Sequence, residues 1–309
     1  MNINYSIIIP HKNIPDLLQR CLNSIPRRED VQIIVVDDNS DAQKVDFENF
    51  PGLNDPFVEV IFGKNENGRK GAGYARNLGL ERATGKWIVF ADADDCFTDC
   101  FNETLDVYKD DEESDAVFFL VTSTDLERGR HIDINNDLHE IKKHNNWNKF
   151  QFKLWHPYGK FIKHSIITNY AISFPEIQCS EDVLFSIKTN FASHKKKIDN
   201  TTIYCITERE NSLVTTVTVK SLSVNFKVRC TTIDFSKKIG INDADLKNGL
   251  YNAWLRIFRK NKLAAIKLLP QAIKRCDLQS FVFAMTHNYP KLKRYWLWEK
   301  LQKIANSQK

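Results

Sequence analysis

Closely spaced cysteine pairs are missing from this chain of 309 residues. Its cysteines are odd in number and include no Cys-x-x-Cys pair, since the two nearest, Cys96 and Cys100, have three residues between them. Zinc sites need paired spacings and disulfide frameworks are typical of small secreted chains, so both are disfavoured and reduced cytosolic thiols fit best. The seven are Cys21, Cys96, Cys100, Cys179, Cys205, Cys230 and Cys276.

Long apolar segments are also missing. The first residues, Met1 to Tyr5, show no basic segment followed by a long apolar one, and they run directly into a predicted strand, so no signal peptide is expected. No apolar run approaches the roughly 18–20 residues that a membrane-spanning helix needs. We therefore expect a cytoplasmic protein that is soluble or peripheral at the inner face of the membrane.

Several catalytic and nucleotide-binding motifs have no counterpart here. The histidines form no His-x-x-x-His pattern, and there is neither a Gly-x-Ser-x-Gly elbow nor a Cys/His dyad. His156 and His164 flank a basic and aromatic stretch more typical of a surface or a pocket wall than of a metal site. The Gly-rich segment 65–77 lacks the Gly-Lys-Ser/Thr ending of a P-loop, and its third glycine is misplaced for a dinucleotide fingerprint. It still offers helix-start N–H groups and cations to a diphosphate.

Acidic residues are scarce in the last part of the chain. Residues 246–309 hold 14 Lys and Arg against two acids, whereas the preceding 245 residues hold 30 basic and 37 acidic groups. This asymmetry predicts contact with an anion, such as a membrane surface or a phosphorylated substrate. The aromatic and cationic stretch 289–298 suits a helix at the inner membrane interface. The alternative is a set of solvated basic helix faces, with Trp296 packed on the rest of the protein.

The first hundred residues alternate between short apolar runs and helical periodicity. Continuous apolar runs predict strands covered on both faces, and strand-helix-strand order predicts an α/β fold with a mostly parallel sheet between helices. Leu18, Leu22 and Ile25 share a helical face, and Pro15 suits the first turn of that helix. The predicted strands are 5–10, 32–38, 58–62 and 86–91, and the predicted helices are 15–25 and 73–83.

The rest of the chain is less regular until its last part. We predict strands at 116–122 and 201–207, a polar and mobile stretch at 125–147, and a helix at 181–191 with Ser180 as its N-cap. Beyond about residue 220 the pattern is helical, with amphipathic segments at 222–239, 245–258 and 263–276. The expected organisation is a body in residues 1–220 and a basic α-helical region in 221–309.

Acidic residues follow two of the predicted strands. Ligands bind beyond the carboxyl ends of the strands in an open parallel sheet, and Asp37-Asp38 and Asp92-Ala93-Asp94-Asp95 are expected there. Residues two apart in extended chain point the same way, so Asp92 and Asp94 can converge on one Mg²⁺ or Mn²⁺ ion. Such an ion would bridge a nucleotide diphosphate and offset the charge that grows as it leaves. The alternative is a turn with helix-capping acids.

A third acidic pair, Glu181-Asp182, opens the helix predicted at 181–191. Acids at this position often only complement the helix dipole. One of them can also serve as a general base if the fold brings it to an acceptor hydroxyl. The spacing leaves both interpretations open.

Taken together, these motifs resemble glycosyltransferase family 2, whose members have the GT-A fold. The resemblance covers residues 5 to about 212 and implies inverting transfer of a sugar from a nucleotide diphosphate, usually UDP. The implied acceptor is a hydroxyl of a glycan or lipid-linked sugar in surface polysaccharide or glycolipid synthesis, and no nucleic-acid partner is expected. The matching segments are 6–13 (SIIIPHKN), 34–41 (IVVDDNSD), 73–79 (GYARNLG), 85–95 (GKWIVFADADD), 180–185 (SEDVLF) and 209–213 (RENSL).

The resemblance also implies roles for single residues. Asp182, beside Glu181, would deprotonate the acceptor hydroxyl. Asp94 would be the principal ligand of Mn²⁺ or Mg²⁺, with Asp92 and Asp95 as further candidates. Residues 1–115 would form the nucleotide-sugar half of the catalytic domain, and 116–220 the acceptor half. The residues implied in nucleotide-sugar binding are Pro10, His11, Asn13, Asp38, Arg76, Asp92 and Ala93.

Some features depart from the family pattern. Many relatives have a Tyr-Asn pair where this chain has His11-Lys12-Asn13, and residues 221–309 match no family motif. They also lack the amphipathic and transmembrane tail of processive synthases, which favours transfer of single sugars or short repeats. A non-catalytic nucleotide-sugar-binding or scaffold protein is a second possibility, against which the three acidic elements argue. A nucleotidyltransferase would have a Gly-rich basic loop directly after the first strand, where this chain reads Pro-His-Lys-Asn.

Overall fold

The structure is a computed structural model that describes residues 2–64, 71–147, 152–177, 179–208, 218–241 and 243–276. It divides into two compact units, Met1–Thr216 and Val217–Lys309, which are described separately below. Among the described residues, no helix is both long enough and apolar enough to cross a membrane.

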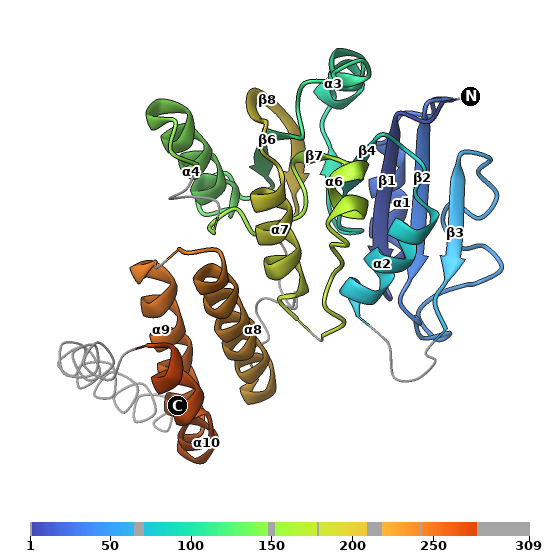
Figure 1. Ribbon diagram of the computed structural model, residues 1–309. Coiled ribbons are helices and arrows are strands. Elements are labelled where there is room, and N and C mark those ends of the chain that lie inside the picture. Colours follow the sequence, from blue (N-terminus) through green and yellow to red (C-terminus); the bar gives the residue numbers. More distant parts are fainter. Residues whose placement is uncertain are drawn as a thin grey trace. The chain divides into compact units, whose positions relative to one another are not determined.

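The first unit is built on an eight-stranded sheet (Figure 1). Strands β3, β2, β1 and β4 pair in parallel, as do β6 and β8, while β7 and β5 run antiparallel to their neighbours. The predicted α/β fold with a mostly parallel sheet is therefore confirmed. The order across the sheet is β3 (Val58–Phe62), β2 (Val31–Asp37), β1 (Tyr5–His11), β4 (Trp87–Phe90), β7 (Lys160–Lys163), β6 (Ala116–Ser123), β8 (Lys196–Ile206) and β5 (Cys96–Phe97).

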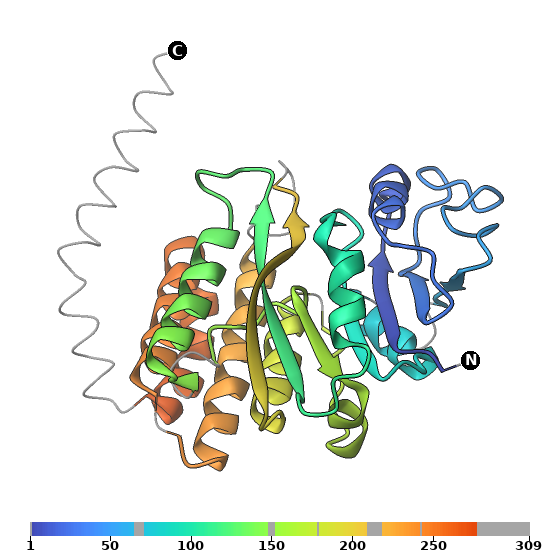
Figure 2. The same cartoon turned by 90° about the horizontal axis from the view of Figure 1, so that it is seen from above.

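Alternate residues of each central strand enter separate cores on the two faces of the sheet. Ile7 and Ile9 of β1 lie in one core with α1 (Pro15–Asn23) and α3 (Cys100–Tyr108). Ile8 lies in the opposite core, which holds side chains of α2 (Ala72–Arg82), α6 (His164–Asn169) and α7 (Glu181–Ala192). Figure 2 shows the two helix layers from above. Burying an Ile stabilises the fold by roughly 1.5–3 kcal/mol, so continuous apolar strands require this double cover.

Helix α2 approaches the sheet closely because it carries a glycine where it crosses β1. A Cβ at Gly79 would lie 2.4 Å from Cγ2 of Ile8, well inside any tolerated contact. Side chains must interdigitate at near-crystalline density in such a core, so only hydrogen fits at this position. The second glycine of the GYARNLG segment thus sets how near α2 and its functional residues lie to β1.

The helix and strand boundaries predicted for the first hundred residues agree with the structure to within about two residues, the usual scatter of such boundaries. Pro15 begins α1 as expected. Helix α7 begins at Glu181, but Ser180 makes no capping hydrogen bond with its side chain. Its φ of 62° is left-handed, whereas capping side chains normally come from extended backbone. The predicted cap is therefore wrong in its chemistry, although its position is right.

The prediction of a mobile stretch at 125–147 is wrong, because helix α4 (His131–His144) lies there. Leu138 and Ile141 are buried against Ala116 and Phe118 of β6, and Ile134 packs at the edge of the same cluster. Their spacing of four and three residues forms one helical stripe. The many polar residues between them obscure this stripe in the sequence. Strand β5 and helix α3 were also not predicted.

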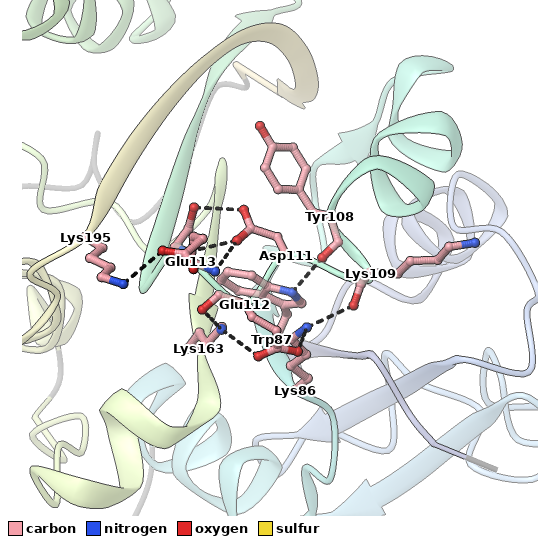
Figure 3. A network of polar contacts seen from close by, with 10 residues as sticks. Lys86, Trp87, Tyr108, Lys109, Asp111, Glu112, Glu113, Lys163 and Lys195 are labelled. Atoms are coloured by element: carbon pink, nitrogen blue, oxygen red, sulfur yellow. Dashed lines mark hydrogen bonds and ion pairs between the residues drawn. The ribbon is translucent and has the colours of Figure 1, made fainter.

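Charged side chains tie together the edge of the sheet where β4 begins (Figure 3). Lys86 Nζ lies 2.5 Å from Oε1 of Glu112, and Lys163 Nζ lies 3.3 Å from Oε2 of the same side chain. Glu112 is largely exposed, so these ion pairs contribute little stability. The buried Trp87 indole donates a hydrogen bond to Tyr108 O at 3.0 Å, which anchors the loop after α3 more firmly. This edge therefore has a structural role, opposite the strand ends that carry the acidic motifs.

The second unit contains the helices α8 (Val219–Lys238), α9 (Ala244–Lys260) and α10 (Lys262–Arg275). They correspond to the three predicted amphipathic segments and share one apolar core. Trp254 donates its indole N–H to Ala265 O at 2.8 Å, joining α9 to α10. Asn261 separates these two helices and accepts from Ala264 N–H as the N-cap of α10. The interfacial helix predicted at 289–298 lies outside the described residues.

Candidate functional site

The loop after β1 is held by a buried histidine and aspartate. His11 Nδ1 lies 2.8 Å from Oδ1 of Asp37, and its Nε2 accepts the Ile14 N–H at 3.1 Å. The proton must therefore reside on Nδ1, which donates to Asp37. Burial opposes the charge of Asp37, but hydrogen bonds from His11 and Ser40 hold the pKa of that carboxyl below its usual value. With both ring nitrogens used inside the protein, His11 shapes this loop.

Asp38 connects the ends of β1 and β2 to the start of α2. Its Oδ1 accepts the Gly71 N–H at 2.7 Å, and Lys12 Nζ lies 3.1 Å from its Oδ2. Asn13 joins the same two loops, because its N–H donates to Ser40 Oγ at 2.8 Å. The structure thus brings Pro10, His11, Asn13 and Asp38 together at neighbouring strand ends, where a ligand of an open sheet is expected.

Arg76 of α2 links two acidic motifs that are far apart in sequence. Its Nη2 lies 2.7 Å from Oδ1 of Asp92, and its Nη1 lies 2.9 Å from Oε1 of Glu181. The guanidinium also lies over the Phe174 ring, 5.3 Å from its centroid. Burial disfavours this charge, yet Asp92 and Glu181 outweigh that effect and raise the pKa of Arg76. One buried cation, with 4% of its surface exposed, therefore fixes both acidic motifs at the same place.

The turn after β4 is fixed by Asp95 and a tyrosine from β8. The hydroxyl of Tyr204 donates to Asp95 Oδ2 at 2.8 Å and accepts the Asp92 N–H at 2.8 Å. The other oxygen of Asp95 accepts the Thr207 N–H at 2.7 Å. Burial, followed by the charge of Asp92, raises the pKa of Asp95 to about 8 despite these hydrogen bonds. Both Asp95 oxygens thus accept hydrogen bonds that hold the turn carrying Asp92 and Asp94.

We expect Tyr204→Phe to lower the free energy of unfolding by about 1–3 kcal/mol, because it leaves a backbone N–H and a carboxyl oxygen without their partner. Urea unfolding measures this loss. Tyr5→Phe is the matched control, since Tyr5 is equally buried but its hydroxyl donates only to Leu105 O. It should cost about 0.5–1.5 kcal/mol. Equal losses in the two variants would contradict the bridging role of Tyr204.

The first turn of α7 carries the Glu181-Asp182 pair, the other acidic motif that Arg76 contacts. Glu181 is buried and paired with Arg76, while Asp182 is partly exposed. Burial and the adjacent charge of Glu181 raise the pKa of Asp182 to about 7, although Arg76 opposes that rise. Asp92 contributes to the same rise, so its charge also acts on Asp182. A carboxylate with a pKa near neutrality is well matched to proton transfer at physiological pH.

The residues that would hold a divalent ion are Asp92 and Asp94. Both are partly exposed at the end of β4, and Arg20 of α1 fixes the Asp94 backbone by donating to its carbonyl oxygen. Within the described ranges, no group of three or more His, Cys, Asp or Glu side chains is placed to hold a metal. Mg²⁺ characteristically binds through one or two carboxylates together with substrate phosphates and water. Two acids at the end of a strand therefore fit such an ion.

A sequence-family model described as glycosyl transferase family 2 matches residues 6–172, more than half of the chain. The chain belongs to glycosyl transferase family 2. That span includes the β1 and β2 loops, Arg76 and the acidic turn after β4. The Glu181-Asp182 pair lies beyond it.

Curated relatives of this family 2 protein include three glycosyltransferases. "Uncharacterized glycosyltransferase YibD" of Escherichia coli (strain K12) is 35% identical over 102 residues, 32% of this chain and 28% of its own length. EpsJ of Bacillus subtilis (strain 168), also named an uncharacterized glycosyltransferase, is 25% identical over 67% of this chain and 62% of its own. A "PGL/p-HBAD biosynthesis glycosyltransferase" of Mycobacterium bovis is 30% identical over 42% and 52%. The matches thus cover less than two thirds of these relatives.

Two solved structures show the same fold. S. aureus TarS 1-349, in complex with UDP-GlcNAc, matches with a TM-score of 0.63 and 20% identity, covering 91% of this chain and 81% of TarS 1-349. The mannosyltransferase PcManGT from Pyrobaculum calidifontis, in complex with GDP-Man and Mn²⁺, matches with a TM-score of 0.52 and 16% identity over 98% and 85%. At these identities the likeness concerns the fold. It agrees with the GT-A architecture expected for the family.

Several residues that organise the site were missed in the sequence. Tyr204 and Thr207 lie more than a hundred residues from Asp95, so no local spacing connects them. Arg20 lies on the exposed side of α1 and donates to Thr207 Oγ1 at 2.6 Å. The only sequence signal for Tyr204 is its place in the predicted strand 201–207. The RENSL segment 209–213 and the cations of 65–70 lie outside the described residues.

Proposed function

We propose that this family 2 protein transfers a sugar from a nucleotide diphosphate donor, a UDP-sugar, to a hydroxyl of a glycan or lipid-linked acceptor, inverting the anomeric carbon. The observation that carries the proposal is the Arg76 link between Asp92 and Glu181. It joins the acids suited to a metal and a diphosphate to the helix that carries a candidate base. UDP-GlcNAc bound to TarS and GDP-Man with Mn²⁺ bound to PcManGT support a nucleotide-sugar donor.

Each group of residues has a part in this reaction. Asp38 and the loop backbone at Pro10 and Asn13 bind the nucleotide, while His11 and Asp37 hold that loop in place. Asp92 and Asp94 bind Mn²⁺ or Mg²⁺, and Asp95 positions them. When bound, the ion offsets the charge that develops on the leaving diphosphate.

Asp182 accepts the proton of the acceptor hydroxyl, which then displaces the diphosphate from the opposite face of the sugar. A single displacement of this kind inverts the anomeric centre and requires no covalent nucleophile. Glu181 is paired with Arg76, so its role is to position that guanidinium and the start of α7. Asp182, with its pKa raised to about 7, is the better base of the two.

Thermal-shift measurements with nucleotide sugars test this donor site. A UDP-sugar at a hundred times its Kd should stabilise the protein by about 2.7 kcal/mol. We expect tighter binding, and so a larger shift, with Mn²⁺ than with EDTA, and Asp94→Asn should remove the difference. Asp111→Asn is the control, since that acid caps a turn at the opposite edge of the sheet, where β4 begins. No shift with UDP-, GDP-, CMP- or dTDP-sugars in the presence of Mn²⁺ would contradict the proposal.

We further propose that residues 1–115 form the donor half and 116–220 the acceptor half of the catalytic domain, followed by a basic helical region in 221–309. A lipid-linked acceptor requires a position at the membrane surface. The excess of Lys and Arg after residue 246 supports a cytoplasmic, peripheral location at the inner, anionic face.

A further inference from the structure

Helix α10 exposes a row of large apolar side chains. Leu263 is 72% exposed, Ile266 is 56% exposed and Ile273 is 37% exposed. With Pro270, which is also exposed, they lie at spacings of three, four and three residues along the helix. At 100° per residue these four positions fall within about 80° of the helix circumference. We call this set the α10 stripe.

The opposite side of α10 is already packed. Ala265, Ala272 and Cys276 are buried in the core that α10 shares with α8 and α9. A helix that is apolar on two sides is normally covered on both. Single exposed apolar residues are common on protein surfaces, but a continuous row on one helix indicates a binding surface. The α10 stripe is therefore a candidate binding surface.

Positive charge borders the stripe on both sides. Lys262 lies on one flank of the stripe, and Lys267 and Lys274 lie on the other, within about 80° of its centre at 100° per residue. All three are exposed, and α10 contains no acidic residue. An apolar row bordered by long cationic side chains matches a surface that is apolar below and anionic above, because lysine stems extend along the apolar layer and their amines reach the phosphates.

We propose that the α10 stripe inserts into the interfacial layer of an anionic lipid membrane, with the three lysines on lipid phosphates. This deepens the peripheral location in the proposed function by naming its contact surface, and it rests on that location alone. Charge argues against two other occupants. A second copy of the chain would bring lysines against lysines. Residues 277–309 carry six Lys and Arg against two acids, so they too would bring positive charge to a positive surface.

Flotation of the full-length protein with vesicles tests the stripe. The wild type should float with phosphatidylcholine vesicles that contain phosphatidylglycerol, and much less with phosphatidylcholine alone. Lys262→Gln with Lys267→Gln and Lys274→Gln should weaken partitioning by about a hundredfold at low salt, and by little at high salt where screening already removes the attraction. Leu263→Ser with Ile266→Ser and Ile273→Ser should weaken it by about tenfold or more at either salt concentration.

A matched triple variant on the first unit controls for general loss of apolar surface. Val107, Leu126 and Ile132 are 66%, 71% and 36% exposed, and their serine variants should float like the wild type. Equal flotation of the two serine triples would overturn the proposal. So would a stripe variant that keeps its flotation but changes its oligomeric state or melts several degrees lower, since the stripe would then contact protein. The UDP-sugar thermal shift should be unchanged in the stripe variant, so a failure here and a failure of the donor site are separable.

Discussion

Replacing Arg76 with methionine is expected to lower the free energy of unfolding by about 3–5 kcal/mol near pH 8, because the variant leaves the buried Glu181 and the partly exposed Asp92 without their cation. Asp92 and Glu181 both lose a hydrogen-bonded partner within 2.9 Å. Donor turnover should fall as well, since neither the Asp92 side chain nor the start of α7 keeps its contact with the guanidinium. Urea unfolding and nucleotide diphosphate release measure the two effects.

The loss of stability in the Arg76→Met variant should depend on pH. The guanidinium opposes the burial and the Glu181 charge that raise the pKa of Asp182, so without it that pKa rises further above the value in the unfolded chain. A raised pKa makes the folded state bind protons more tightly, so the stability of the variant falls as pH increases through that range. In the wild type the cation offsets this penalty. The difference between the two proteins should therefore be smaller at pH 5 than at pH 8.

Arg82 on the same helix provides the control for this experiment. Its side chain is 62% exposed and pairs with Glu59 at 2.7 Å. Screening by water limits such a pair, so Arg82→Met should cost less than about 1 kcal/mol at either pH. If Arg76→Met costs no more than Arg82→Met, the Arg76 link does not hold the site together.

The parts of this fold that could be predicted are those whose signal is local. Residues 33–36, before Asp37-Asp38, and 87–91, before Asp92, are apolar without interruption, which identifies β2 and β4 as buried strands and places the acids at their carboxyl ends. Helix α4 was missed because only Ile134, Leu138 and Ile141 face its cluster, among many polar residues. The helix forms because β6 offers that stripe a surface to pack on, and the surface exists only in the folded chain.

The candidate site likewise has parts with a local signal in the sequence and parts without one. Asp38, Asp92, Asp94 and Asp182 are visible as motifs, but the sequence did not reveal what each carboxylate contacts. Asp95 is next to Asp94 in the chain, yet its oxygens are held by Tyr204 and Thr207. These partners come from β8 and the residue after it, whose approach to β4 follows from the strand order. The same long-range packing pairs Glu181 with Arg76 and leaves Asp182 able to act as a base.

Replacing Asp182 with asparagine is expected to lower kcat by about 10²–10⁴-fold, the usual contribution of a positioned general base. The wild-type kcat/KM should rise with pH and level off above about 7, because Asp182 must be ionised to accept a proton and its pKa is raised to about 7. A cation bound at Asp92 offsets one of the charges that raise this pKa, so the inflection should move lower at saturating Mn²⁺. The asparagine variant should lose this inflection.

Glu181→Gln distinguishes the two acids of the pair. Glu181 is buried against Arg76, so its amide variant should lower the free energy of unfolding by about 3–5 kcal/mol, with a smaller effect on kcat than Asp182→Asn has. The pH inflection should survive in Glu181→Gln, because the ionising group is still present. The opposite pattern, a lost inflection in Glu181→Gln and a retained one in Asp182→Asn, would make Glu181 the base. A base at Glu181 would need Arg76 to release it, since Oε1 of Glu181 lies 2.9 Å from Nη1 of Arg76.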